Sequence, residues 1–345
     1  MTSPERSGNG SSPTRRPLVT IIAPAYNEAG NAAGLVDFFR QIRSRRPEFD
    51  FELVVVDDGS TDDTSRLVQE ALADDDVARV ATFSRNFGSH AAITAGLALS
   101  RGDCAITIGT DLQEPIEMVD QFLDAWQDGN ELVWSVRETR NVPKGKGFAN
   151  WLARVFNAVF YRFANLPNLP KEGPAQVLLS RKVIDVLNAM PERNRNIFGM
   201  FAWVGFKQTT IYFHQKPRAS GKSKWTTAKK IRLVMDSFVQ FSTAPFLATM
   251  LLGVLLALLG LGGGLAALIV ALATLSAPVG WLLVLCSVFF VGGLQLAALG
   301  GFGEYVWRAG DDARRRPLYI LSGVHDHGAP ASAPMTTRSE VGVEA

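Results

Sequence analysis

The sequence predicts an α/β fold with a mostly parallel sheet, followed by a helical hairpin that crosses a membrane. First, short apolar runs rich in β-branched residues alternate with helical patterns between residues 18 and 136. Second, Ser237–Gly303 is a run of 67 residues without Asp, Glu, Lys, Arg or His. Such a run is long enough for two membrane helices of about 20 residues each. Third, a chain of 345 residues is long enough for about two domains.

Composition excludes several classes of protein. The 35 Lys and Arg residues nearly balance the 33 Asp and Glu residues, and a net charge of +2 argues against a general nucleic-acid-binding protein. The two cysteines, Cys104 and Cys286, are too few for a disulfide scaffold.

Residues 1–17 are rich in Ser, Gly and Pro and lack the apolar core of a signal peptide. We therefore expect them to form a disordered tail in the cytoplasm.

The sheet domain is expected to span residues 18–215. Its first part holds five predicted strands, which are Leu18–Ala23, Leu53–Val56, Val77–Phe83, Cys104–Ile108 and Leu132–Val136. The predicted helices between and after them are Asn31–Arg46, Thr61–Leu72, Ser89–Leu99 and Glu114–Gln127. Because strands and helices alternate, the strands should pair in parallel. Residues 175–214 are expected to add a strand, a helix and a hairpin over Trp203–His214.

The second half of the chain is organised around its charge-free run. Residues 216–244 are basic and are expected to form amphipathic helices beside a membrane, and 245–303 should hold spans at about 245–274 and 279–302. Lys and Arg flank the outer ends of both spans, which places both termini in the cytoplasm and makes residues 304–345 a cytoplasmic tail. The alternative is a buried helical hairpin in a large soluble protein.

Two polar motifs follow the first two predicted strands. Pro24-Ala25-Tyr26-Asn27-Glu28 lies at the carboxyl end of the first, and Val56-Asp57-Asp58-Gly59-Ser60-Thr61-Asp62 lies at the carboxyl end of the second. Ligands of open α/β sheets bind at the carboxyl ends of the strands, so both motifs should share one edge of the sheet. Acidic side chains there can bind a base edge or ribose hydroxyls, and Tyr26 can pack on a base. The alternative for Asp58-Gly59-Ser60 is an ordinary turn that caps a helix.

Two further motifs should reach the same edge. Ser84-Arg85-Asn86-Phe87-Gly88 follows the third strand, and its alternative is a loop with one surface arginine. The fourth motif, Gly109-Thr110-Asp111-Leu112-Gln113-Glu114-Pro115, follows the fourth strand. Its Asp111 and Gln113 offer two oxygen ligands, which suit a hard cation such as Mg²⁺ that shares them with substrate phosphates. A single aspartate is more often a cap or turn residue, but four polar clusters at one edge favour a site. The sequence lacks a GxGxxG motif and a Walker lysine, so a dinucleotide or P-loop site has no support.

Together these motifs resemble those of the family 2 glycosyltransferases with a GT-A fold, which is a Rossmann-like fold. Within that family, the chain is similar to the polyprenyl-phosphate glycosyltransferases related to dolichol-phosphate mannose synthase, in the bacterial branch with two C-terminal transmembrane helices. The resemblance covers about residues 18–321 and continues past the sheet. The motifs that extend it are Asn196-Ile197-Phe198, Trp203-Val204-Gly205-Phe206, Arg218–Trp225, Phe241–Pro245, Gly303-Glu304-Tyr305 and Arg316–Tyr319.

The resemblance implies roles for individual residues. The nucleotide-sugar donor would be held by Pro24, Tyr26, Glu28, Asp57, Asp58, Arg85 and Asp111. Mg²⁺ or Mn²⁺ would be held by Asp111 and Gln113. The family pattern has an acidic residue where this chain has Gly109, and related enzymes often place another near the sugar, where this chain has Gly173-Pro174-Ala175-Gln176. One anionic metal ligand is therefore missing, and the identity of the donor sugar is open.

A lipid monophosphate acceptor would be ionised near neutral pH, so it would need cations rather than a strong general base. Arg137 follows the fifth strand, Arg154 lies on an amphipathic segment, and a basic cluster precedes the membrane. The residues expected to bind the acceptor phosphate are Arg137, Arg218, Lys222, Ser223 and Lys224. Asp111, Arg137 and Arg154 are the expected catalytic residues. The alternative for the basic cluster is general attraction to anionic lipid headgroups.

The expected function is therefore the inverting, metal-dependent transfer of a sugar from a nucleotide-sugar to undecaprenyl or decaprenyl phosphate. The resemblance implies a multi-pass protein of the inner membrane with its catalytic domain in the cytoplasm. Relatives with two spans often assemble through them, which leaves a homo-oligomer open. One alternative is a polysaccharide-forming family 2 synthase, although the sequence lacks the Gln-x-x-Arg-Trp motif. The other is a membrane scaffold that keeps the fold without catalysis, which Gly109 and Ala175 would favour.

Overall fold

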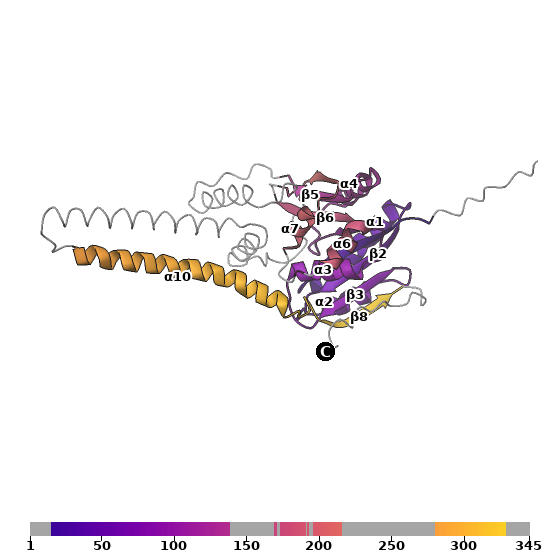
Figure 1. Ribbon diagram of the computed structural model, residues 1–345. Coiled ribbons are helices and arrows are strands. Elements are labelled where there is room, and N and C mark those ends of the chain that lie inside the picture. Colours follow the sequence, from indigo (N-terminus) through magenta and orange to yellow (C-terminus); the bar gives the residue numbers. More distant parts are fainter. Residues whose placement is uncertain are drawn as a thin grey trace, which may run out of the picture.

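The computed structural model describes residues 15–138, 169–170, 173–190, 192, 196–215 and 280–328. Its central feature is an eight-stranded sheet with the strand order β7-β5-β6-β4-β1-β2-β3-β8. Helices cover both faces of this sheet, and one long helix extends away from it (Figure 1). The predicted α/β class is confirmed for the sheet domain.

Four parallel strands form the centre of the sheet, in agreement with the sequence. They are β1 (Leu18–Ala25), β2 (Asp50–Asp57), β3 (Ala78–Phe83) and β4 (Cys104–Thr107). β1 pairs in parallel with both β2 and β4, and β2 pairs in parallel with β3. The connecting elements are the 3₁₀ turn η1 (Ala29–Asn31) and the helices α1 (Ala32–Arg45), α2 (Thr64–Ala71) and α3 (Ser89–Leu99).

The other half of the sheet mixes strand directions. After α4 (Ile116–Gln127) and β5 (Leu132–Arg137), strand β6 (Pro174–Ser180) pairs antiparallel with both β4 and β5. Helices α6 (Arg181–Ala189) and α7 (Ile197–Trp203) follow. β7 (Gln208–Phe213) then pairs in parallel with β5. The hairpin predicted for Trp203–His214 is therefore wrong, because the segment contributes one strand whose partner is β5.

Alternating side chains bury one core on each face of the sheet. Ile21 of β1 faces a cluster that includes Phe39 of α1 and Phe122 of α4. Its neighbour Ile22 faces a second cluster with α3, α6 and α7, which includes Trp134. Because both faces are covered, the central strands are apolar almost throughout, as is typical of parallel sheets.

The last strand lies within the segment 304–345, which was expected to be only a tail. β8 (Leu321–His327) pairs antiparallel with β3 at the sheet edge, and the Arg79 Nε donates to Asp326 Oδ1 at 2.6 Å. The His327 Nε2 lies 2.9 Å from the Ala73 carbonyl oxygen. Part of the segment 304–345 therefore belongs to the sheet, and it covers the edge that β3 would otherwise expose.

The long helix α10 (Gly280–Ala313) covers all but the first residue of the second expected span, 279–302, and continues beyond it. Among the described residues, no helix combines the length and hydropathy that a membrane crossing requires. The first expected span, 245–274, and the expected basic helices of 216–244 lie outside the described residues.

Candidate active site

The loops that carry the first two motifs are joined by reciprocal hydrogen bonds. The backbone N–H of Asn27 donates to Ser60 Oγ at 2.8 Å, and the backbone N–H of Thr61 donates to Asn27 Oδ1 at 2.8 Å. Asn27 has φ +52°, a left-handed conformation that asparagine tolerates better than most residues. The two loops therefore form one unit at the carboxyl ends of β1 and β2.

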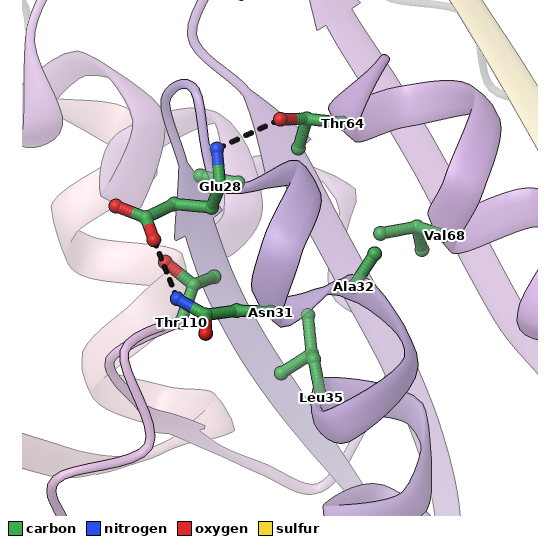
Figure 2. Close-up of a pocket in the computed structure, with 8 residues that line it drawn as sticks. Glu28, Asn31, Ala32, Leu35, Thr64, Val68 and Thr110 are labelled. Atoms are coloured by element: carbon green, nitrogen blue, oxygen red, sulfur yellow. Dashed lines mark hydrogen bonds between the residues drawn. The ribbon is translucent and has the colours of Figure 1, made fainter. Parts of the chain in front are cut away.

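Glu28 is held at the start of the turn that leads into α1. Its backbone N–H donates to Thr64 Oγ1 at 2.8 Å, and its carboxylate Oε2 accepts from Asn31 Nδ2 at 2.7 Å (Figure 2). Thr110 of the fourth motif lines the same small recess, whose floor is formed by apolar side chains such as Leu35. The first and fourth motifs therefore meet here, beside the start of α2.

The two adjacent aspartates of the second motif are both buried, and each binds backbone N–H groups. Asp57 Oδ1 accepts from the N–H of Ser60 at 2.9 Å. Asp58 Oδ1 accepts from the N–H of Phe87 at 2.6 Å, and Oδ2 accepts from the N–H of Gly88 at 2.9 Å. Asp58 therefore fastens the third motif to the second, a positioning role that the sequence reading did not assign to it.

The same two loops are in close backbone contact. Gly59 has φ +65°, and a Cβ placed on it would lie 2.4 Å from the carbonyl carbon of Arg85. Glycine is therefore required both by the backbone conformation and by the approach of the neighbouring loop. The exposed guanidinium of Arg85 lies 4.1 Å from the centre of the Phe87 ring, at the outer side of this contact.

The fourth motif lies beside the first. The Thr110 hydroxyl donates to the Pro24 carbonyl oxygen at 3.4 Å, and Leu112 turns the chain with φ +53°. Asp111 is half-buried at this turn, and the Gln113 Oε1 accepts from Gln215 Nε2 at 2.6 Å. The two expected metal ligands therefore sit next to the loop that ends β1.

Sequence reasoning missed Glu114, the most buried acidic residue of the fourth motif. Only 4% of it is exposed; its Oε1 accepts from Gln176 Nε2 at 2.8 Å, and its Oε2 has no hydrogen-bond partner. Burial raises the pKa of the Glu114 carboxyl, the negative charge of Asp111 raises it further, and the positive charge of Arg137 opposes this. Its place directly after the Asp111–Gln113 pair was the signal that could have identified it.

The carboxylates of Asp111 and Glu114 both approach the point where a side chain of residue 109 would begin. A Cβ placed on Gly109 would lie 2.9 Å from Asp111 Oδ1 and 3.0 Å from Glu114 Oε2. Within the described part of the chain, no group of three or more His, Cys, Asp or Glu residues could hold a metal ion. The orphaned oxygen of Glu114 and the carboxylate of Asp111 nevertheless fit a hard cation that takes its other ligands from a bound diphosphate.

Comparison with known proteins identifies the family. The model of glycosyl transferase family 2 matches residues 20–187. An uncharacterised glycosyltransferase from Synechocystis is 33% identical over 307 residues, which are 88% of this chain and 94% of that protein. The chain belongs to glycosyltransferase family 2. It is also similar to a prophage-derived bactoprenol glucosyl transferase of Shigella flexneri, with 29% identity over 310 residues that cover 89% of this chain and 98% of that protein.

One solved structure is similar along much of the glycosyltransferase. It is a mannosyltransferase from Pyrobaculum calidifontis in complex with GDP-Man and Mn²⁺, with 20% sequence identity and a TM-score of 0.47. The match covers 86% of this chain and 88% of that chain.

The remaining expected site residues of the glycosyltransferase divide into two groups. Tyr26 is half-buried just after β1, and Arg137 is exposed at the end of β5, close enough to Glu114 for its charge to act on that carboxyl. Five others, Arg154, Arg218, Lys222, Ser223 and Lys224, lie outside the described residues. Two histidines near these loops make structural contacts: His90 Nδ1 accepts from the Ile197 N–H at 3.4 Å, and His214 Nε2 lies 3.0 Å from Glu138 Oε2.

Proposed function

We propose that this glycosyltransferase moves a sugar from a nucleotide-sugar donor to a polyprenyl phosphate and inverts the anomeric centre. The observation that carries the proposal is the joining of four polar loops at the carboxyl edge of the sheet, around Asp111, Glu114 and Arg137. The full-length similarity to proteins named bactoprenol glucosyl transferases supports the lipid acceptor, because bactoprenol is a polyprenol.

The donor would lie along the two interlocked loops. Tyr26 would pack on the base, and Glu28, Asp57 and Arg85 would offer charges of both signs at the same edge. Pro24 lies near the end of β1, and Asp58 supports the site by holding the loop of Arg85. A nucleoside diphosphate offers a flat base, ribose hydroxyls and anionic oxygens, which together match this set of groups.

Asp111 and Gln113 would hold Mg²⁺ or Mn²⁺ beside the diphosphate. When bound, such an ion neutralises the charge that develops on the leaving nucleoside diphosphate. An oxygen of the acceptor phosphate attacks the anomeric carbon, a new carbon–oxygen bond forms, and the bond to the diphosphate breaks. The acceptor is already ionised, so the chain has to orient and neutralise it rather than remove a proton. Arg137 is the described residue that can do so from the edge of the sheet.

We place the acceptor at the inner leaflet of the cell membrane. The charge-free run Ser237–Gly303 supports an anchor of two spans, and the basic residues before it support a cytoplasmic catalytic domain. Arg154, Arg218, Lys222, Ser223 and Lys224 would complete the phosphate site at the lipid surface. Assembly through the apolar helices is part of the same proposal.

The experiment is a transfer assay with the purified full-length enzyme, a panel of radiolabelled sugar nucleotides and undecaprenyl phosphate in detergent with Mn²⁺. We expect lipid-linked label with at least one donor and a loss of about 100-fold or more in Asp111→Asn. Asp128→Asn makes the same change at an exposed site near the end of α4 and should retain activity. The proposal fails if no donor yields a lipid product and Asp111→Asn binds every nucleotide as the wild type does.

A further inference from the structure

We propose that Glu114 supplies the second carboxylate of the divalent-cation site, beside Asp111 at the turn that contains Gly109. This inference rests on the proposed function, because it concerns the ion that would accompany the donor diphosphate. It assigns a role to a residue of the fourth motif that had none in the sequence analysis.

The geometry brings two carboxylates from one turn to a common point. The position of a Cβ on Gly109 lies 2.9 Å from Asp111 Oδ1, 3.0 Å from Glu114 Oε2 and 3.3 Å from Glu114 Oε1. Both side chains therefore reach over the backbone of Gly109 from the same side. Gly109 itself is partly accessible at the carboxyl end of β4, so this turn is in contact with solvent.

Glu114 is held so that one oxygen remains available. Gln176 of β6 donates to Oε1 at 2.8 Å, which fixes the orientation of the carboxylate. Oε2 is buried and has no hydrogen-bond partner, an arrangement that costs free energy unless a cation or donor completes it. Asp111 supplies a second carboxylate nearby. A cation between the two would give Glu114 Oε2 a partner and would remove the repulsion between the two negative charges.

Glycine at position 109 follows from this arrangement. A side chain there would have its first carbon within about 3 Å of both carboxylates, closer than a Cβ tolerates without displacing them. An aspartate at 109 would therefore shift the carboxylates of Asp111 and Glu114, and its own negative charge would add to theirs. The negative charge of the site is retained, but it reaches the ion from position 114 instead of position 109.

The test measures Mn²⁺ binding to the full-length protein by electron paramagnetic resonance of the free ion, with UDP present and without any acceptor. We expect Glu114→Gln to weaken Mn²⁺ binding at least about tenfold, on the scale of losing a ligand or its support. Glu117→Gln makes the same chemical change on the exposed surface of α4 and should bind Mn²⁺ as the wild type does. Thermal melting without metal checks that each variant is folded.

An experiment that moves the carboxylate from position 114 to position 109 distinguishes a metal ligand from a residue with a merely structural role. Gly109→Asp alone should weaken Mn²⁺ binding, because the new side chain displaces Glu114. Gly109→Asp in the Glu114→Gln background should recover most of the lost affinity. If Glu114→Gln binds Mn²⁺ as the wild type does while Asp111→Asn does not, Glu114 has no role and the proposed function stands. If the wild type itself binds no Mn²⁺ in the presence of UDP, both proposals are wrong about the ion.

Discussion

The ring of Tyr319 stacks on the ring of Phe83, with 5.0 Å between their centroids and 14° between their planes. Phe83 in turn meets Phe87 edge to face at 5.6 Å, and the N–H of Ser84 donates to the carbonyl oxygen of Ile320 at 2.9 Å. The segment that follows α10 is therefore attached to the loop that Asp58 holds. Through these contacts, the C-terminal strand supports the edge of the sheet where the donor would bind.

Replacing Tyr319 tests this support. Tyr319→Ala removes the stacked ring, so it should lower the free energy of unfolding by about 1 kcal/mol and weaken nucleotide binding several-fold. Tyr319→Phe keeps the ring and should keep both properties. Urea-induced unfolding and calorimetric titration with UDP measure the two effects. Unchanged nucleotide affinity in Tyr319→Ala would show that the contact with Phe83 does not support the donor loop.

The close approach of Gly59 to Arg85 predicts a severe effect of one added methyl group. Gly59→Ala combines an unfavourable positive φ with a contact of 2.4 Å, so the two loops must separate. We expect nucleotide binding to be lost, together with about 2 to 4 kcal/mol of unfolding free energy.

Gly129→Ala is the matched control for that substitution. Gly129 also has positive φ, at +80°, but an added Cβ would meet only the end of the Lys207 side chain at 3.8 Å. This variant should lose stability through its backbone conformation alone and should bind UDP normally. Equal nucleotide affinities in the two alanine variants would contradict the role given to the Gly59 contact.

Asp58→Asn separates loop positioning from direct contact with the nucleotide. Asparagine has one accepting oxygen where Asp58 has two, and its NH₂ group cannot accept the Gly88 N–H that Asp58 Oδ2 accepts at 2.9 Å. We expect a cost of about 1 to 3 kcal/mol in unfolding free energy without any ligand. Asp63→Asn changes an exposed residue nearby and should leave the urea midpoint unchanged. A variant of Asp58 that is as stable as the wild type would mean that the side chain acts on the nucleotide alone.

The contacts of the Asp76 carboxylate predict that part of the free energy of unfolding depends on pH. Burial opposes its charged form, but the hydrogen bonds from Arg40 and from the Ala73 N–H, together with the charges of Arg40 and Arg43, outweigh it and hold the pKa of Asp76 below 3.8. The stabilisation is therefore present above pH 3.8 and is lost as the pH falls through the lower folded-state pKa.

The corresponding variant is Asp76→Asn. It should lower the free energy of unfolding by about 2 kcal/mol at pH 7, and the difference from the wild type should shrink below pH 3.8. Urea titrations at several pH values measure this difference. A difference that stays constant down to the lowest accessible pH would show that the charge of Asp76 contributes nothing.

Local sequence patterns were sufficient to predict the strands and helices of the parallel half of the sheet. Ser89–Leu99 was predicted as a helix and is α3 with the same ends, because its apolar residues and its flanking turns are all local signals. The four motifs were also correctly expected at one edge, since that follows from parallel strands alone.

Pairings between distant segments were not predictable in this way. β8 joins β3 through contacts such as that between Arg79 and Asp326, which are 247 residues apart, and its own sequence has no strong alternation. Gln176 and Glu114 meet for the same reason, because β6 enters the sheet from a distant part of the chain. The site residue that was missed is therefore one whose surroundings depend on the antiparallel strand.

The most direct test of the central claim is the mass of the lipid product. The full-length enzyme is incubated with a sugar nucleotide and either undecaprenyl phosphate or undecaprenol, and the lipids are analysed by mass spectrometry. We predict the mass of the phosphorylated lipid plus one sugar residue, with no product from the alcohol. A sugar attached to undecaprenol, or no lipid product with any sugar nucleotide, would contradict an enzyme that joins a nucleotide-activated sugar to a lipid phosphate.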